Sequence, residues 1–467
     1  MSEPERVEPL NPADLLHLVE ALQQRVAELE RINADLCAEN ERLRRRQQRQ
    51  AAPFSKDAPL ATPKRPGRKP GQGRFAHRSA PPPDACGILP IPVPVAASVC
   101  PHCGGELVAA ESEVASITDL PMQPQAVVRH FQVSVCRCAA CGRCVRGRHA
   151  DLAPDQYGAT AHRLGPQLLS VAHSLHYQHG VPVRRVPAIL AELTGVRVTQ
   201  SALTQDALRQ AAGPVGDVYQ TLRAGMAQAE RVHTDDTGWR VGGTPAQLMV
   251  FTTPTVTVYQ IRRQHRNQEV REVLPADYAG VLCSDRGKSY DAQELAAVKQ
   301  QKCVCHLLRS VHDLLETKWG RGRSFGLRVQ QTLREAVALW QAAQAGTAAD
   351  YPMQAARLQA RMTEVLRARA LPDPTNQRLL DDLRWRHARG DLLRFLEDPR
   401  IEPTNNRAER ALRPAVIARK VSQCSKTQPG ADAHAAFASA LRTAVQQGDS
   451  GTERLVHLRR SPPAPDR

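Results

Sequence analysis

A heptad repeat near the start of the chain restricts the fold more than any other sequence feature. Leucine recurs at every seventh position of the segment 12–46: Leu15, Leu22, Leu29, Leu36 and Leu43. If these are d positions, the a positions hold Val19, Val26, Asn33 and Asn40. Leucine at d with β-branched residues at a favours a parallel two-stranded coiled coil, in which a buried Asn fixes the register. The repeat therefore predicts a homodimer or higher oligomer through residues 12–46; the alternative is one amphipathic helix packed on its own domain.

The charge balance points to a polyanionic partner. The 467 residues include 63 Lys and Arg against 47 Asp and Glu, a formal net charge of +16. Such an excess favours nucleic acid over a membrane surface as the partner. The sequence lacks a run of about 18 apolar residues and the basic-then-apolar order of a signal peptide. We therefore expect no membrane association and a cytoplasmic location, where paired cysteines more often bind metal than form disulfides.

A basic segment follows the heptads. Residues 42 to 78 contain 12 Lys and Arg and one acid, Asp57, among many Pro and Gly. This composition predicts a disordered linker over 47–85. Its charges, with Arg68 and Lys69 as candidate contacts, suit a DNA backbone; the alternative is a solvated linker whose charge is incidental.

Two Cys-x-x-Cys pairs, each followed by glycine, predict a zinc site within a small β module over 86–150. The pairs are Cys100 with Cys103 and Cys138 with Cys141. Four thiolates suit a closed, tetrahedral, structural Zn²⁺. Cys136 and Cys144 leave the ligand set open, and free buried thiols are the alternative.

Residues 158–228 read as a helical, helix-turn-helix-like region that binds DNA. A turn at 194–196 separates two helical patterns, and Thr199 or Ser201 is placed to cap the second helix. Arg184, Arg185 and Arg197 are candidate phosphate contacts. A helical hairpin without a DNA contact is the alternative.

Two apolar strands, each ending in acid, open a predicted catalytic domain over 229–448. Asp235 ends the first strand and Asp285 ends the second, with a hairpin (248–263) and a helix (267–274) between them. Strand, hairpin, helix, strand is the order of a ribonuclease-H-like core, in which both acids meet at one edge. Glu409, on a helical run that Thr404 or Asn405 can cap, supplies a third carboxylate. Three carboxylates suit a two-metal site for Mg²⁺ or Mn²⁺.

Other residues compete for these positions. Asp236 is the rival of Asp235, but strand alternation points it to the other face if His233 and Asp235 share one. Asp291 is a rival of Asp285 that lies past the strand end, and Glu402 is a rival of Glu409 that precedes Pro403.

Further side chains have candidate roles around the three acids. Arg410 and Arg413 are candidates for clamping phosphates near the site. His306 either positions a phosphate or carboxylate or is a hydrogen-bonded core histidine.

Two segments complete the expected organisation. The Ala-, Arg-, Leu- and Gln-rich stretch from about 312 to 400 predicts an all-helical insertion into the catalytic domain, which either binds DNA or only packs on the core. The tail, 449–467, is expected to be disordered. The fold class is thus multidomain α+β: a coiled coil, a zinc-binding β module, a helical DNA-binding region and a ribonuclease-H-like α/β core with a helical insertion.

The ordered blocks of the chain resemble a known family. HTDDTGWRV, LMVFTTPTVTVYQI, GVLCSDRGKSYD, CVCHLLRSVHDL and TNNRAERALRPAVIARK, in this order, are similar to the insertion-sequence-66 family of DDE transposases. The resemblance extends over about residues 15 to 448. It implies a catalytic triad of Asp235, Asp285 and Glu409, and a family Cys-x-x-His block at Cys303 and His306. The sequence departs from the family at Asp236 and Arg286.

The resemblance implies a DNA transposase of a bacterial mobile element, associated with the nucleoid. It would bind terminal inverted repeats of double-stranded DNA, cleave to leave 3′-hydroxyls and join these to target DNA with Mg²⁺ or Mn²⁺. Accessory proteins of the same element are possible partners. Two alternatives are a metal-dependent nuclease without strand transfer and a non-enzymatic DNA-binding regulator.

Overall fold

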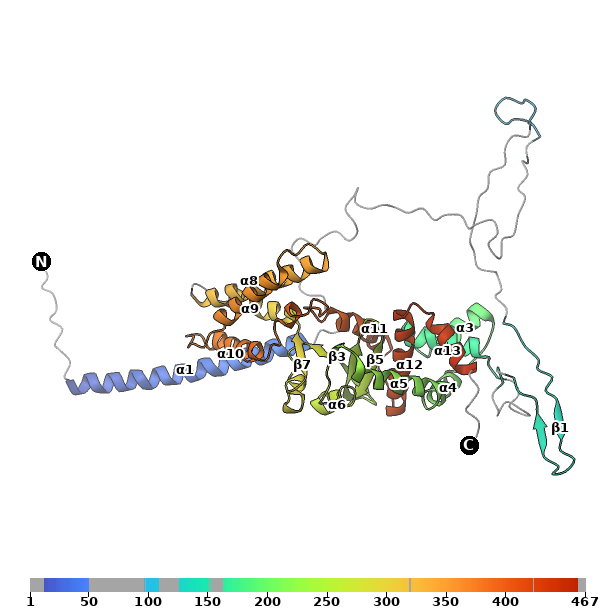
Figure 1. The fold of residues 1–467 in the computed structure, drawn as a ribbon, viewed down its shortest axis with the longest axis horizontal. Coiled ribbons are helices and arrows are strands. Elements are labelled where there is room, and N and C mark those ends of the chain that lie inside the picture. The colour runs from blue at the N-terminus through green and yellow to red at the C-terminus, as the bar shows by residue number, and fades with distance from the viewer. Residues whose placement is uncertain are drawn as a thin grey trace, which may run out of the picture. The chain divides into compact units, whose positions relative to one another are not determined.

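The computed structural model describes residues 12–49, 96, 98–108, 126–149, 151–152, 163–318, 321–422 and 424–460 (Figure 1). The chain divides into two units, residues 1–118 and 119–467, which are described separately. Most of the predicted basic linker, including Arg68 and Lys69, lies outside the described residues.

The first unit contains one long helix. α1 spans Pro12–Arg49 and covers the whole heptad segment. Its described apolar a and d side chains, Val19, Leu22, Val26 and Leu29, are 45–57% exposed, and Asn33 is also exposed. The side chains of Leu15, Leu36, Asn40 and Leu43 lie outside the described set. The helix is present as expected, and the pairing of two such helices stays a prediction.

The second unit is built around a mixed five-stranded sheet of order β5-β4-β3-β6-β7. The central strand β3 (Arg231–Val241) pairs antiparallel with β4 (Thr244–Thr252), which pairs antiparallel with β5 (Thr257–Arg262). On its other side β3 runs parallel to β6 (Val281–Ser284), and β6 runs parallel to β7 (Lys299–Lys302). Together with its helices this sheet confirms an α+β fold.

Two C-terminal helices cover the sheet. α11 (Asn406–Ser422) lies against β3 and β4, and α12 (Gln428–Gln446) lies against β5. The buried face of α12 consists largely of alanine, which lets its backbone approach the strand closely. Ser439 Oγ accepts the Tyr259 N–H at 2.8 Å, so α12 also covers the open hydrogen-bonding edge of β5.

The helices before the sheet follow the predicted helix-turn-helix order. They are α2 (Pro166–His173) with a π-helical turn (Ser174–Gln178), α3 (Val186–Thr194), α4 (Gln200–Ala211) and α5 (Pro214–Gly225). Gly195, with φ 71°, ends α3, and Thr199 Oγ1 caps α4 by accepting the Ala202 N–H at 3.2 Å. The region is not a separate body, because Val215 and Tyr219 of α5 belong to the same hydrophobic core as the sheet.

A second hydrophobic core lies among the helices that separate β7 from α11. These helices are α7 (Val304–Thr317), α8 (Arg321–Gln344), α9 (Tyr351–Val365) and α10 (Pro374–Ala388), followed by a 3-10 turn (Arg394–Leu396). Their buried Leu, Val, Met and Phe side chains form one cluster of their own. The helical segment begins at 304, earlier than the expected 312.

The expectation of a disordered tail from 449 is wrong for residues 451–460. These residues form α13 (Gly451–Arg460), which buries Leu455 and Val456. Arg459 Nη2 lies 2.6 Å from Asp206 Oδ2, in an ion pair whose side chains are 7% and 5% exposed. This ion pair anchors the helix; residues 461–467 lie outside the described part.

The remaining elements are short. They are β1 (Val135–Arg137) paired antiparallel with β2 (Cys144–Arg146), α6 (Asn267–Arg271), and 3-10 turns at Met226–Gln228, Lys288–Tyr290 and Gln293–Leu295. Among the described helices, none has both the length and the apolar character needed to cross a bilayer.

Candidate active site

The register of two parallel strands brings Asp235 and Asp285 to the same level of the sheet. The last β3–β6 pair is His233 with Cys283, a sequence offset of 50. Asp235 and Asp285 have the same offset and each follow that pair by two residues. The expectation that Asp235 ends its strand is wrong, because β3 continues to Val241 beside β4. It instead lies just past the point where the parallel pairing with β6 stops.

The rival acid Asp236 has a different partner. Its Oδ1 lies 3.0 Å from His265 Nδ1, and its backbone N–H donates to Asp235 Oδ1 at 2.9 Å. His233 is buried, with its Nδ1 3.3 Å from Asn405 Oδ1. Adjacent strand residues point to opposite faces, so Asp235 and Asp236 enter different surroundings.

Asp285 is held in a tight turn after β6. Its Oδ1 accepts the Gly287 N–H at 2.9 Å. A Cβ at Gly287 would stand 3.0 Å from that same oxygen, so glycine leaves room beside the carboxylate. Arg286 turns away to Asp382 of α10, at 3.0 Å, and does not neutralise Asp285. Arg286, where the sequence departs from the family pattern, therefore contacts the helical segment.

The rival Asp291 is committed to an internal ion-pair cluster. It lies 3.0 Å from Lys302 Nζ and accepts two hydrogen bonds from Arg386, at 3.0 and 2.8 Å. Lys302 is fully buried, so Asp291 is needed to compensate that charge. The other rival, Glu402, precedes α11 and is bound by the guanidinium of Arg407.

Glu409 lies in the first turn of α11, whose start is fixed by Asn405. Asn405 is buried, at 1% exposed, and its side chain contacts residues of β3. Its Nδ2 donates to the Thr234 carbonyl at 2.7 Å, and its backbone N–H donates to Cys303 Sγ at 3.2 Å. One residue thus joins the helix of Glu409 to the strand of Asp235 and to the beginning of α7.

The three predicted acids share an electrostatic environment. Burial raises the pKa of Asp235 to about 7; the Asp236 N–H opposes this shift, and the charges of Asp285, Asp236 and Glu409 add to it. In the described residues the three carboxylates are not gathered within 4.8 Å of one another. Like charges held nearby in a partly buried site are an arrangement that a bound divalent cation would stabilise.

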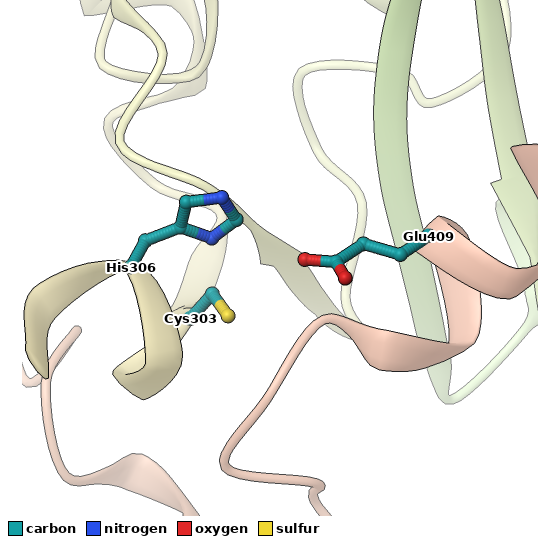
Figure 2. A group of neighbouring side chains, drawn as sticks. All are labelled: Cys303, His306 and Glu409. Carbon is teal, nitrogen blue, oxygen red and sulfur yellow. The ribbon is translucent and has the colours of Figure 1, made fainter. Parts of the chain in front are cut away.

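A second group of potential ligands adjoins the same acid. One ligand atom each from Cys303, His306 and Glu409 lie within 4.8 Å of one another. Figure 2 shows the Glu409 side chain extending from α11 toward Cys303 and His306 at the start of α7. Among the residues that the structure describes, His306 Nδ1 is buried and has no hydrogen-bond partner, unlike the hydrogen-bonded core histidine considered above.

The two Cys-x-x-Cys pairs adopt the same local turn. In each, the N–H of the first cysteine donates to the carbonyl five residues later at 2.9 Å. The glycine four residues after that cysteine has positive φ, 75° at Gly104 and 69° at Gly142. Backbone N–H groups at the turns lower the pKa of Cys100 and of Cys138. Cys136 and Cys144 lie on β1 and β2.

The candidate DNA contacts in the described ranges are exposed. Arg184 and Arg185 lie immediately before α3, and Arg197 lies in the turn before α4. Arg410 and Arg413 lie on the exposed face of α11, close in sequence to Glu409. The partners of Asn405 and Lys302 were not predicted from the sequence, because they lie far away along the chain.

Comparison with known families agrees with these observations. Residues 162–433 match the family described as Transposase IS66 family. The chain therefore belongs to the insertion-sequence-66 transposase family. A search of curated proteins gave no match.

Proposed function

We propose that the protein is a DNA transposase that cleaves the ends of its mobile element and joins them to target DNA. The order of the sheet, with two antiparallel strands on one side of β3 and two parallel strands on the other, supports a ribonuclease-H-like core. The observation that carries the proposal is the common level of Asp235, on β3, and Asp285, just after the neighbouring strand β6, with Glu409 acting electrostatically on Asp235.

Asp235, Asp285 and Glu409 would hold Mg²⁺ or Mn²⁺. Carboxylate oxygens are the ligands such hard cations prefer, and the raised pKa of Asp235 reflects, besides burial, the mutual repulsion that a cation would remove. When bound, divalent cations supply charge neutralisation and polarisation of phosphodiester oxygens. Exposed Arg410 and Arg413 would bind the phosphates that flank the reacting one.

The reaction consists of two displacements at phosphorus. In the first, the oxygen of water forms a bond to phosphorus and the bond to the 3′-oxygen breaks, which leaves a 3′-hydroxyl. In the second, that hydroxyl attacks a phosphodiester of target DNA and displaces its 3′-oxygen. Phosphoryl transfer requires mainly positioning and charge neutralisation, so the protein needs no covalent intermediate.

The N-terminal parts would assemble the protein on DNA. The exposed apolar stripe of α1 supports a coiled-coil dimer. The turns at 100–105 and 138–143, with their lowered cysteine pKa values, support each Cys-x-x-Cys pair as metal ligands. One structural Zn²⁺ held by Cys100, Cys103, Cys138 and Cys141 stays a prediction from the sequence. Arg184, Arg185 and Arg197, with Arg68 and Lys69, would contact the DNA backbone.

The test uses labelled duplexes taken from the DNA that flanks the gene, with Mg²⁺ or Mn²⁺ and a target plasmid. We expect cleavage and joined products with the wild type, and neither with Asp235→Asn, Asp285→Asn or Glu409→Gln, while all four proteins still retard the duplex in a gel. Asp236→Asn is the control and should retain cleavage. Cleavage without joining would reduce the protein to a nuclease; binding by the wild type without any cleavage would favour a regulator.

A further inference from the structure

We propose that Cys303, His306 and Glu409 form a binding site for Zn²⁺ or a similar borderline transition metal, and that this site shares Glu409 with the Mg²⁺ centre. The metal site itself stands on the geometry of these three residues. Only the sharing of Glu409 rests on the proposed function.

The first argument is the composition of the ligand set. A thiol sulfur, an imidazole nitrogen and a carboxylate oxygen lie within 4.8 Å of one another. Sulfur and nitrogen ligands select Zn²⁺ and Co²⁺ over Mg²⁺, which prefers oxygen alone. Ligand atoms around a tetrahedral Zn²⁺ stand roughly 3.5 Å apart, so small side-chain rotations would complete the site. Three protein ligands leave a fourth position for water or a phosphate oxygen.

The second argument is the orphaned nitrogen of His306. Its Nδ1 is buried and has no hydrogen-bond partner in the described residues. A buried polar atom left unpaired costs about 1–3 kcal/mol, and a metal ion would satisfy it. Cys303 and His306 stand three residues apart, so one turn at the start of α7 presents both side chains to α11 (Figure 2).

The third argument is that one residue, Asn405, positions both the Cys303 thiol and the helix that carries Glu409. Asn405 donates its N–H to Cys303 Sγ at 3.2 Å and precedes the first turn of α11, where Glu409 lies. A Glu409 carboxylate bound to Zn²⁺ would be withdrawn from Asp235 and Asp285. Zinc bound here would therefore lower Mg²⁺-dependent activity in competition with Mg²⁺.

The test of the site is Co²⁺ titration of the full-length, reduced, metal-free protein, followed by thiolate-to-cobalt charge-transfer absorption. Because the two Cys-x-x-Cys pairs, if they hold metal as proposed, would also take up Co²⁺, the wild type is compared with single variants. Cys303→Ser and His306→Ala should each lose one equivalent of tight binding, with affinity there falling by more than the roughly 10–100-fold that loss of an outer-shell partner costs. Matched controls, Cys305→Ser and His312→Ala on the same helix, should retain it.

Equal Co²⁺ stoichiometry and spectra in the wild type and the two site variants would overturn the proposal. His306 is only partly buried, so its variant decides the matter even if Cys303→Ser fails to fold. In the cleavage assay, Zn²⁺ should inhibit the wild type and inhibit His306→Ala at least tenfold less; equal inhibition of both would overturn the sharing of Glu409. If the wild type cleaves nothing, the proposed function fails, while the Co²⁺ titration still decides whether the metal site exists.

Discussion

The side-chain amide of Asn405 donates a 2.7 Å hydrogen bond to the backbone carbonyl of Thr234, the residue before Asp235. The two residues are separated by 171 positions in the chain. Because α11 begins immediately after Asn405, this bond sets where Glu409 lies relative to the strand of Asp235.

Asn405→Ala should therefore weaken both stability and activity. The substitution leaves the buried Thr234 carbonyl without its donor, at a cost of about 1–3 kcal/mol, and frees the start of α11 to shift. Urea unfolding and the cleavage assay measure the two effects. Asn406→Ala, one residue further along and exposed, should change stability by less than about 0.5 kcal/mol. Equal stability of the two variants would contradict the positioning role of Asn405.

The stability of the metal-free protein should fall as the pH rises from about 4 to about 7. The pKa of Asp235 is raised to about 7 in the folded state, from an ordinary value of 3.8. The native protein therefore binds an extra proton in this window, and the resulting stabilisation, fully present below pH 4, is lost as pH rises through 7. Asp235→Asn, which resembles the protonated form, should be more stable than the wild type at pH 8 by on the order of 2–4 kcal/mol.

Urea unfolding at pH 4 and pH 8 measures this difference, with exposed Asp277→Asn as the control. The advantage of Asp235→Asn should vanish at pH 4. Mg²⁺ added at pH 8 should stabilise the wild type and not Asp235→Asn. A pH-independent difference between the two proteins would show that Asp235 titrates normally.

Asp291→Asn should unfold the protein far more readily than Asp285→Asn. Asp291 compensates the buried Lys302 and pairs with Arg386, and removing one partner of a buried ion pair costs about 3–5 kcal/mol. An Asn at 285 still accepts the Gly287 N–H, so we expect a change below about 1 kcal/mol with complete loss of cleavage. Thermal unfolding and cleavage separate the two. A stable Asp291→Asn variant without cleavage would instead make Asp291 a metal ligand.

Arg459→Ala should destabilise the helical region by about 3 kcal/mol, since Asp206 is buried and loses a bidentate partner. Although burial opposes it, hydrogen bonds from His173 and Arg459 lower the pKa of Asp206, so the carboxylate stays charged. The matched control is Arg454→Ala on the same helix, whose exposed pair with Asp449 contributes less than about 1 kcal/mol. Urea unfolding compares them, and equal midpoints would rule out an anchoring role for Arg459.

Leu22→Glu combined with Leu29→Glu should convert an oligomer into a monomer. Both leucines are exposed on α1 and stand at d positions, where a charge cannot be buried against a second helix. Sedimentation equilibrium measures the mass. The control is Gln24→Glu, at the outward f position, which should leave the oligomer intact. A monomeric wild type would contradict the proposed coiled coil.

The sequence predicted the strands next to Asp235 and Asp285 but missed the edge strand β7. Asp235 and Asp285 could be found because apolar strands precede them. β7 was missed because its four residues are Lys, Gln, Gln and Lys, and strand prediction depends on apolar alternation. These polar side chains are buried by specific partners: Gln301 Nε2 donates to the Leu392 carbonyl at 3.0 Å, and its Oε1 accepts the Phe395 N–H at 3.1 Å.

The same reasoning explains the other differences. Asn405 is of a residue type that commonly caps helices. Only the tertiary structure shows that its side chain donates to the Thr234 carbonyl. Residues 451–460 look like a polar tail because the partner of Arg459 lies elsewhere in the sequence. Local sequence patterns thus predicted most strands and helices. The hydrogen bonds and ion pairs between buried polar side chains could be identified only from the tertiary structure.

The ion pair of Asp206 and Arg459 can form only late in protein synthesis. The two residues are 253 positions apart, so at ribosomal rates the arginine follows the aspartate by roughly 10–50 s. Throughout that interval the Asp206 carboxylate of α4 has His173 and Arg209 as partners but lacks Arg459. Helices α2 and α4 can therefore complete their packing against α13 only after the sheet and its insertion have left the ribosome.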